Sequence, residues 1–324
     1  MNRYKAAVVG LGSIGLGYDY DAADDSRVLT HAAGFHFHPG FELAAGVDGS
    51  AAARERFTAK YGRPAFATMS AMMASCRPAV VSVAVPTASH REVFEEVVSH
   101  GPRAVLAEKP LGGTLRDAAA ITALAKDKGT LLLVNYIRRF EPGVLALKAA
   151  LAAGRCGEIY KGTVWYSKGL ANNGSHFIDL LIFLLGPVTA VRLLSPGTEP
   201  GPDPEPDFVL SFGAVDVYFL AGREACFSVK EIALMGTGGC VNYENGGARI
   251  SVRTTVPHPT FAGYTVLAER GTEIATDFYR YQAHVTEALY RTLDGGAPLA
   301  STGETALTTL AAVEAVRELC REAR

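Results

Sequence analysis

The sequence AVVGLGSIGLGYDYDAADDSRVLTH, residues 7–31, decides the fold, because three glycines follow directly on a short apolar run. Gly10 permits a tight turn, Gly12 lets the backbone approach a pyrophosphate, and Gly15 allows a helix to pack closely against the preceding strand. The first amides of that helix would point at the anion. The pattern predicts a dinucleotide-binding turn, and we expect the cofactor to contact Gly10, Gly12, Ser13, Ile14 and Gly15.

The acid that ends the second predicted strand, AAGVD, indicates which dinucleotide binds. Asp48 can accept hydrogen bonds from the hydroxyls of the adenosine ribose, which favours NAD, and its charge would repel the 2'-phosphate of NADP. Arg54 or Arg56 could offset that repulsion, so NADP stays open.

The spacing between the glycine turn and this acid points to an insertion. Asp48 lies 33 residues after Gly15, whereas about 20 residues are typical. Residues 18–29 hold four aspartates and two tyrosines, and we expect them to interrupt the first crossover helix, which resumes near Thr30 and His31. We expect its acids to lie in a solvated loop, the alternative being a flap that faces the substrate or another subunit; they are Asp19, Asp21, Asp24 and Asp25.

Composition limits the class of protein and of ligand. With 324 residues, 48% of them hydrophobic and 20% charged, the chain can bury a large core, and its length favours two domains. A formal charge of -2 without a long basic run argues against nucleic acid and anionic membranes as partners and favours small molecules. Five scattered cysteines without a C-x-x-C pair fit neither a disulfide framework nor a zinc site, and they indicate a reducing cytoplasm. We expect no bound metal, no signal segment and no membrane span.

The first 135 residues alternate short β-branched runs with helical stretches, which predicts parallel strands joined by crossover helices. The expected strands cover residues 6–9, 42–47, 80–85, 104–107 and 131–134, and the expected helices cover residues 50–61, 89–100 and 114–128. Strands as apolar as VVSVAV suggest burial on both faces of the sheet. We therefore predict an α/β protein in which residues 1–135 form a doubly wound parallel sheet of the Rossmann type.

After Pro142 the pattern changes, and residues 136–324 are predicted to form an α+β domain with a large, mostly antiparallel sheet. The expected strands cover residues 160–167, 208–212, 215–220, 226–235, 249–254 and 264–269. The expected helices cover residues 142–153, 177–186, 277–293 and 304–322, the last of them free to pack back on the first domain. Residues 195–207 are rich in Pro, Gly and acids, so we expect a mobile surface loop without a functional role.

One candidate for chemistry is the motif A-E-K-P, residues 107–110, which follows a predicted strand of the first domain. Ligands of open parallel sheets bind at the carboxyl ends of the strands, so we expect Lys109 to face the cofactor. Near a positively charged nicotinamide its ammonium would have a lowered pKa and could exchange a proton with a substrate hydroxyl. The alternative is a surface lysine beside a turn proline.

The second candidate lies in KGLANNGSHFIDLL, residues 168–181, where polar turn and cap residues precede an apolar helix. Asn172, Gly174 and Ser175 place His176 in the first helical turn, where the helix dipole disfavours imidazolium and leaves a neutral imidazole. Asp179 lies three residues on and shares the same helix face, so it could orient the ring. The alternative is a purely structural histidine.

Taken together, these motifs resemble the Gfo/Idh/MocA family, the group of glucose-fructose oxidoreductase and inositol dehydrogenase. The resemblance rests on G-x-G-x-x-G, on V-D after the second strand, on V-P-T-x-x-H at residues 85–90, on E-K-P at residues 108–110 and on G-x-H-x-x-D at residues 174–179. It implies an NAD(P)-dependent oxidoreductase of sugars, cyclitols or related polyols, with a Rossmann domain joined to an open-faced sheet domain. Lys109 and His176 would be catalytic, and Pro86 and His90 would lie near the nicotinamide.

The same resemblance extends the expected binding sites. Cofactor contacts beyond the glycine turn are expected at Asp48, Pro86, Thr87, His90, Glu108 and Lys109. Substrate contacts are expected at Asn135, Arg138, Arg139, Lys161, Tyr166, Lys168, Asn172 and Asp179. If several of the basic groups point into the cleft, the substrate is anionic, such as a nucleotide-linked sugar or a sugar acid; the alternative is that half or more are ordinary surface charges.

One position departs from the family pattern. The family commonly has an aspartate four residues before the histidine, and Asn172 stands there in this chain. An asparagine can hold a hydroxyl but cannot transfer a proton, so proton transfer would rest on Lys109 and His176. The departure keeps two alternatives to a sugar or cyclitol dehydrogenase open: a cofactor-binding sensor on the same fold and an imine or tetrapyrrole reductase. We also expect a homodimer or homotetramer formed through the sheet of the second domain.

Overall fold

The computed structural model describes residues 3–197 and 203–323. The chain divides into two compact units, one formed by Met1–Phe140 and Tyr279–Leu307, the other by Glu141–Phe278 and Thr308–Arg324. We call them unit 1 and unit 2. Residues 279–307, which we predicted as part of the second domain, thus belong to unit 1, because the helix they contain packs on that unit's core.

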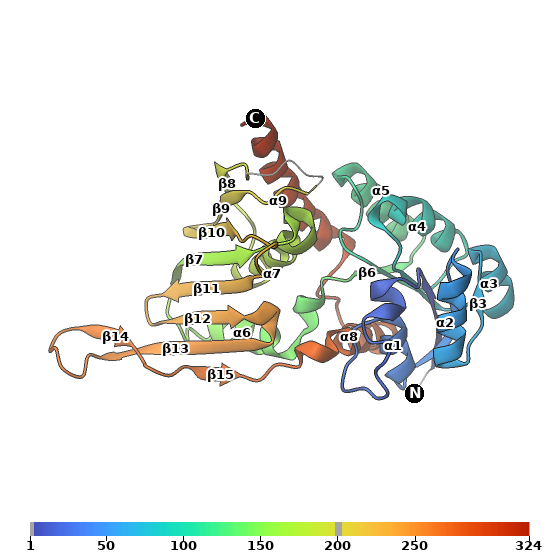
Figure 1. Cartoon of the computed structure of the whole chain (residues 1–324), viewed down its shortest axis with the longest axis horizontal. Coiled ribbons are helices and arrows are strands. Elements are labelled where there is room, and N and C mark those ends of the chain that lie inside the picture. The colour runs from blue at the N-terminus through green and yellow to red at the C-terminus, as the bar shows by residue number, and fades with distance from the viewer. Residues whose placement is uncertain (1–2, 198–202, 324) are drawn as a thin grey trace. The chain divides into compact units, whose positions relative to one another are not determined.

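The sheet of unit 1 confirms the predicted Rossmann topology (Figure 1). Its six strands lie in the order β3-β2-β1-β4-β5-β6, and every pair is parallel. The strands are β1 (Tyr4–Val9), β2 (Phe41–Val47), β3 (Ala65–Phe66), β4 (Val80–Val83), β5 (Ala104–Ala107) and β6 (Leu131–Val134). The order reverses beside β1, and a sheet of this kind binds its ligand at the carboxyl ends of the strands at that point.

Most helices of unit 1 begin where a side chain caps them. The side chains of Thr30, Ser50, Thr68 and Thr114 each accept a hydrogen bond from the amide three residues further on. This bond satisfies an amide that has no acceptor within the helix. The α-helices are α1 (His31–Phe37), α2 (Ala51–Tyr61), α3 (Met69–Cys76), α4 (His90–Ser99), α5 (Leu115–Asp127) and α8 (Tyr281–Gly295). Shorter helical turns are η1 (Ser13–Gly17), η2 (Thr87–Ser89), η3 (Ile137–Phe140) and η6 (Phe278–Arg280). The sequence patterns do not predict α3 and β3.

The insertion after the glycine turn is present, and α1 resumes at His31 as predicted. The prediction that its acids are solvated is correct for Asp21, Asp24 and Asp25 and wrong for Asp19, which is only 4% exposed. The Asp19 carboxylate accepts hydrogen bonds from the amides of Leu29 (2.6 Å) and Thr30 (3.0 Å) and from the Thr30 hydroxyl (2.6 Å). This carboxylate therefore joins the two ends of the insertion.

A lysine holds the same insertion from the side of α2. The Lys60 ammonium donates to the carbonyls of Asp19 (2.9 Å) and Ala22 (3.2 Å) and also to that of Tyr20. The guanidinium of Arg56 lies 4.3 Å from the centre of the Tyr20 ring, a cation-π contact. These contacts hold the insertion in a defined position within unit 1.

Unit 2 contains a second sheet, mostly antiparallel as predicted, in the order β14-β13-β12-β11-β7-β10-β9-β8, with β15 paired to β13. Among the described residues of this sheet, only β7 and β10 pair in parallel, and the other strand pairs are antiparallel. The strands are β7 (Ile159–Tyr166), β8 (Ala190–Ser195), β9 (Asp207–Phe212), β10 (Val215–Ala221), β11 (Lys230–Gly236), β12 (Gly239–Glu244), β13 (Arg249–Pro257), β14 (Thr265–Leu267) and β15 (Thr272–Ile274). The sequence patterns do not predict strands β8 and β15. The hairpin of β13 and β14 extends beyond the rest of the sheet (Figure 1).

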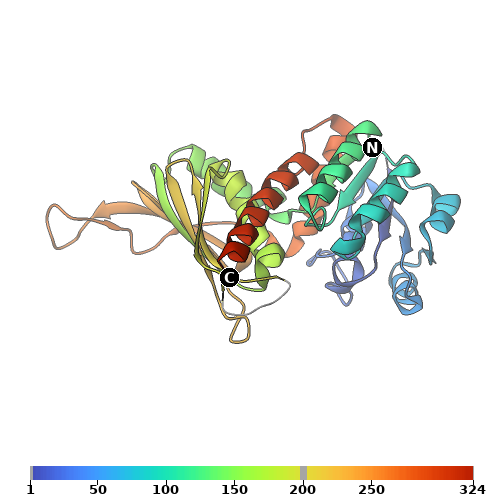
Figure 2. The ribbon, with the colours of Figure 1, turned by 90° about the horizontal axis from the view of Figure 1, so that it is seen from above.

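Helices cover one face of this sheet (Figure 2). They are α6 (Pro142–Ala152), α7 (Ser175–Leu185) and the part of α9 (Gly303–Glu322) that belongs to unit 2, with the turns η4 (Gly169–Gly174) and η5 (Asn245–Gly247) beside them. Phe177 of α7 and Val316 of α9 join the core under the strands. On the opposite face Trp165 is 45% exposed and Met235 is 38% exposed, so this face is open in the part of the chain that the structure describes.

Asp19 gives a first test of this fold. An Asn side chain can still accept from the amides of Leu29 and Thr30 through its one oxygen, but it turns its NH2 toward the Thr30 hydroxyl and removes the charge of the acceptor. We expect Asp19→Asn to lower the free energy of unfolding by about 2 to 3 kcal/mol, because hydrogen bonds to a charged acceptor are the stronger class. Urea denaturation measures this difference. The matched change Asp21→Asn, at an exposed position, should cost less than about 0.5 kcal/mol; equal losses would contradict the anchoring role.

Candidate active site

The glycine turn has the steric features of a phosphate-binding loop. A Cβ at Gly10, where φ is +94°, would lie 2.5 Å from the Ala84 carbonyl oxygen, and one at Gly15 would lie 1.9 Å from that of Gly10. A Cβ at Gly12 would meet nothing within 4 Å. Packing therefore requires glycine at two of the three positions, whereas the third borders open space in front of the first amides of η1. That space suits a group that must approach the main chain, and so the turn fits a dinucleotide pyrophosphate.

Asp48, the predicted ribose ligand, also organises this turn. Its Oδ2 accepts from the amide of Leu11 (2.8 Å) and its Oδ1 from that of Ser50 (2.8 Å). Each carboxylate oxygen keeps a further lone pair for a ribose hydroxyl. Arg54 donates to the carbonyls of Asp48 (2.8 Å) and Gly49 (2.9 Å), so one guanidinium lies against the main chain of Asp48.

His90 is buried, with 2% exposure, and its ring contacts two loops that follow strands of the sheet. Its Nε2 lies 2.9 Å from the Val85 carbonyl oxygen and its Nδ1 3.4 Å from that of Leu111. The ring thus ties the end of β4 to the loop after E-K-P. The intervening turn is closed by the amide of Ser89, which donates to the Pro86 carbonyl (2.9 Å). The predicted contacts Pro86 and Thr87 lie in this turn.

Behind Lys109 lies a closed ring of hydrogen bonds among four side chains. Glu108 Oε1 accepts from His31 Nε2 (2.8 Å) and from Asn135 Nδ2 (2.6 Å). Gln282 Oε1 accepts from the same Asn135 amide (3.2 Å), and Gln282 Nε2 lies 3.4 Å from His31 Nδ1. If Gln282 donates to Nδ1, the proton of a neutral His31 lies on Nε2 and points at Glu108.

This ring fixes the charge and the position of Glu108. Burial of its carboxyl raises its pKa, but hydrogen bonds from His31 and Asn135 and the charge of Lys109 outweigh burial, so the pKa lies below its ordinary value. The second oxygen, Oε2, accepts from the Lys109 amide (3.1 Å). Glu108 is therefore an ionised group that holds the main chain of the candidate catalytic lysine, which is half-buried and joined to Pro110 by a cis peptide bond.

Sequence reasoning missed His31 and Gln282 as members of this site. His31 was seen only as the point where α1 resumes, although a histidine at a buried position of an apolar helix is a usable signal. Gln282 lies 147 residues from Asn135 in the chain, and no local pattern marks it.

The two arginines after β6 are buried instead of lying on the surface. Arg138 is 6% exposed and Arg139 is 5% exposed, and both belong to η3. Arg139 donates to the Ala300 carbonyl (3.0 Å) in the segment before α9. Arg139 therefore has a structural partner.

His176 and Asn172 lie in unit 2, on one continuous helical segment formed by η4 and α7. Gly174 and Ser175 have helical backbone angles, and the Ser175 hydroxyl donates to the Ala171 carbonyl (2.6 Å) one turn back. α7 begins at Ser175 with Gly174 at its N-cap position, as predicted, but the side chains of Asn172 and Ser175 do not cap it, because the helical run already starts at Gly169. His176 follows that start by two turns, which weakens the dipole argument made for its imidazole.

Other predicted substrate contacts of unit 2 have structural partners. Tyr166 is fully buried and donates to the Pro206 carbonyl (2.6 Å), which places it in the core. Asp179, also fully buried, accepts from the Thr309 hydroxyl (2.9 Å). Lys168 Nζ lies 3.3 Å from Glu224 Oε1, and Lys161 Nζ lies 5.9 Å from the centre of the Tyr218 ring. Of this group, His176 is half-buried and Asn172 exposed.

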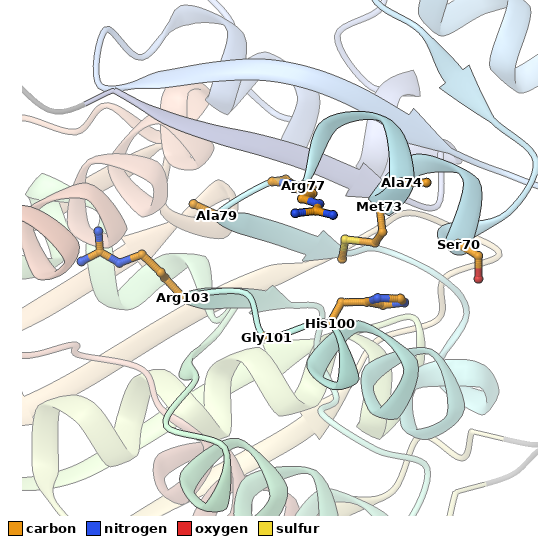
Figure 3. Close-up of a pocket in the computed structure, with 9 residues that line it drawn as sticks. Ser70, Met73, Ala74, Arg77, Ala79, His100, Gly101 and Arg103 are labelled. Carbon is orange, nitrogen blue, oxygen red and sulfur yellow. The ribbon is translucent and has the colours of Figure 1, made fainter.

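A cavity of about 590 Å³ lies elsewhere in unit 1, beside Arg77, Ala79, His100 and Arg103 (Figure 3). Ala79 and Arg103 directly precede β4 and β5, so the cavity is at the amino ends of these strands, the edge opposite the glycine turn. Its basic residues follow the C-terminal ends of α3 and α4, where cations offset the helix dipole. Among the described residues we find no cluster of metal-ligating side chains and no helix able to cross a membrane.

Comparison with known proteins agrees with this geometry. Residues 4–136 match the family model described as "Oxidoreductase family, NAD-binding Rossmann fold". Among curated proteins, the chain is 31% identical over 176 residues to the putative UDP-kanosamine synthase oxidoreductase subunit of Amycolatopsis mediterranei, and the match covers 48% of each protein. It is also 30% identical over 122 residues to inositol 2-dehydrogenase of Rhizobium meliloti, where the match covers 38% of this chain and 36% of that protein. The matched region thus spans about half or less of the length of these relatives.

Solved structures show the same fold over the whole chain. A putative NADPH-dependent oxidoreductase from Desulfitobacterium hafniense superposes with a TM-score of 0.82 at 22% identity, covering 100% of this chain and 97% of that one. The WlbA dehydrogenase from Bordetella pertussis, solved with NADH and UDP-GlcNAcA, gives a TM-score of 0.79 at 20% identity, with the same coverage.

The glycine turn makes a prediction that separates folding from binding. Because a Cβ at Gly12 meets open space, Gly12→Ala should fold with an unchanged melting temperature but lose at least about tenfold in affinity for NADH. The methyl group would occupy the space that the pyrophosphate needs. A fluorescence titration with NADH measures the affinity, and Gly295→Ala, also in open space, is the matched control. Unchanged affinity in Gly12→Ala would contradict the assignment of this turn.

Proposed function

Because residues 4–136 belong to the Gfo/Idh/MocA oxidoreductase family, with its NAD-binding Rossmann fold, we propose that the protein is an NAD(P)-dependent dehydrogenase or reductase. Its substrate would be a secondary alcohol or ketone of a sugar, a cyclitol or a nucleotide-linked sugar. The observation that carries the proposal is the edge of the sheet in unit 1, where the glycine turn, Asp48 and the Glu108-Lys109 pair follow the strands β1, β2 and β5.

The curated relatives support the substrate class. Their names describe an inositol 2-dehydrogenase, a D-apiose dehydrogenase and a UDP-kanosamine synthase subunit, each of which acts on a polyol or a sugar by its name. Structures of the same fold include a levoglucosan dehydrogenase with NADH. A polyhydroxylated small molecule is the class that these relatives have in common.

The chemistry divides between the cofactor and the protein. When bound, the nicotinamide would supply the hydride acceptor or donor. Lys109 would hold the substrate hydroxyl and exchange its proton, while Glu108 keeps the lysine main chain in place through the hydrogen bond to its amide. His176, in unit 2, is the alternative group that would take or return this one proton. The expected meeting of Lys109 and His176 stays a prediction, as do their catalytic roles.

Cofactor choice follows from Asp48 in this proposal. Its carboxylate is ordered by two main-chain amides and would accept from the ribose hydroxyls of NAD. Arg56 is engaged by the Tyr20 ring, whereas Arg54 lies next to the acid. We infer a preference for NAD, with Arg54 as the group that would make NADP acceptable.

The role of Lys109 is tested by Lys109→Ala. Turnover should fall by about 10²- to 10⁴-fold, the usual contribution of a general acid or base, while the Kd for NAD stays within about twofold. The assay is NADH formation over free sugars, cyclitols and nucleotide sugars. Lys126→Ala, on the exposed face of α5, is the matched control and should keep full turnover.

The wild-type protein and the variant His176→Ala separate the rival functions. A cofactor-binding sensor, suggested by Asn172, would bind NAD but give no turnover in the wild-type protein. An imine or tetrapyrrole reductase would reduce an unsaturated substrate with NADPH and tolerate His176→Ala. Either result would overturn the dehydrogenase proposal.

We further propose that copies of the protein associate through the open face of the sheet in unit 2, because large apolar side chains such as Trp165 and Met235 are exposed there. Sedimentation velocity at micromolar concentration should show a dimer or tetramer. Trp165→Lys should weaken the assembly, since it places a charge where apolar contact is expected. A monomeric wild-type protein would contradict the proposal.

A further inference from the structure

The helical segment that carries Asn172 and His176 begins without a cap of its own. Lys168, at the N-cap position of η4, has a left-handed backbone and no capping hydrogen bond from its side chain. The first four amides of a helical segment have no partner inside it and need acceptors from elsewhere. The location of this segment therefore depends on what supplies those acceptors.

A segment more than thirty residues further along the chain supplies all four. Glu205 Oε1 accepts from the amide of Gly169 (2.9 Å), and the Pro204 carbonyl accepts from that of Leu170 (3.0 Å). The carboxylate of Asp203 takes the next two, with Oδ1 accepting from Ala171 (2.8 Å) and Oδ2 from Asn172 (2.9 Å). Four successive amides are thus held by three successive residues of the chain.

Two further features fit this arrangement. A Cβ at Gly169, where φ is +85°, would lie 2.1 Å from Asp203 Oδ2, so only glycine lets the carboxylate come this close. On its other side Asp203 Oδ1 lies 3.5 Å from Arg317 of α9, the helix whose Thr309 also binds Asp179 of α7. One helix therefore holds both the cap of η4 and the inner face of α7.

From these contacts we propose that Asp203 is a positioning residue of the reaction, one that acts through the main chain on Asn172 and His176 without touching the substrate. The inference rests on the proposed function. The continuous helical backbone from Gly169 to Ser175 transmits a displacement of the first turn to His176. Because loss of alignment by about 1 Å can cost 10²-fold in rate, the cap has a direct influence on turnover.

The test compares Asp203→Ala with Asp207→Asn in the full-length protein. Asp207 belongs to the same acidic segment and also accepts one main-chain amide, that of Ala221 (2.8 Å), but it has no part in the cap of η4. Asp203→Ala should lower kcat by about ten- to hundredfold with the Kd for NADH unchanged. Asp207→Asn should leave both values within about twofold.

A second measurement does not need a substrate. In protein labelled at histidine, the imidazole signal of His176, identified by its loss in His176→Gln, should shift or broaden in Asp203→Ala and stay in place in Asp207→Asn. Asp203→Asn keeps one acceptor oxygen and should give intermediate values of kcat and of the signal shift. A general loss of stability would not produce this graded response. Circular dichroism at the assay temperature shows whether each variant is folded.

The outcomes distinguish this inference from the proposed function. If the wild-type protein gives no turnover while the His176 signal still responds to Asp203→Ala, the proposed function fails and the positional coupling stands. If the wild-type protein turns over substrate and Asp203→Ala behaves like Asp207→Asn in kcat and in the His176 signal, the positioning role is overturned.

Discussion

Carboxylates that accept main-chain amides hold the turns on which the candidate site depends. Asp48 joins the end of β2 to the glycine turn through the amide of Leu11, Asp19 joins the ends of the insertion, and Glu108 holds the amide of Lys109. In unit 2, Glu141 accepts from the amides of Val144 (2.8 Å) and Asp277 (2.7 Å). Because a buried amide without an acceptor costs about as much as a lost hydrogen bond, each of these acids fixes a loop that the regular helices and strands leave without internal support.

Much of the fold could be predicted from the sequence because its signals are local. The glycine turn, the five predicted parallel strands and the helices capped by Ser50 and Thr114 each show their pattern within a dozen residues. The elements that the patterns do not predict have weak local signals. Helix α3 is short and rich in Met. Strand β8 lies at the edge of its sheet, contains a charged residue and has no fully buried position. Their positions are set by the partners they pack against.

The candidate site was less predictable, for a physical reason. Lys109 and His176 could be found because each stands in a motif, but the groups that hold them are far away in the chain. His31 lies 77 residues from Glu108, and Gln282 lies 251 residues from His31. The sequence predicts Asn172, Gly174 and Ser175 as turn and cap residues of the apolar helix α7, because such residues prefer these positions. The helical run instead starts earlier, at η4, and the acceptors of its first amides come from Asp203 and Glu205. Residues 203–207, predicted as part of a loop without a role, include these acceptors; residues 198–202 of the same prediction lie outside the described part of the chain.

The ammonium of Lys60, surrounded by three carbonyl oxygens of the insertion, resembles a monovalent ion in an oxygen cage, with the difference that it is covalently tethered to α2. A free potassium or sodium ion in such a cage exchanges with the solvent, and its occupancy follows the salt composition of the medium. A tethered cation has a fixed local concentration. The cation that holds the loop next to the glycine turn is therefore part of the chain itself, and it cannot exchange with the ions of the medium.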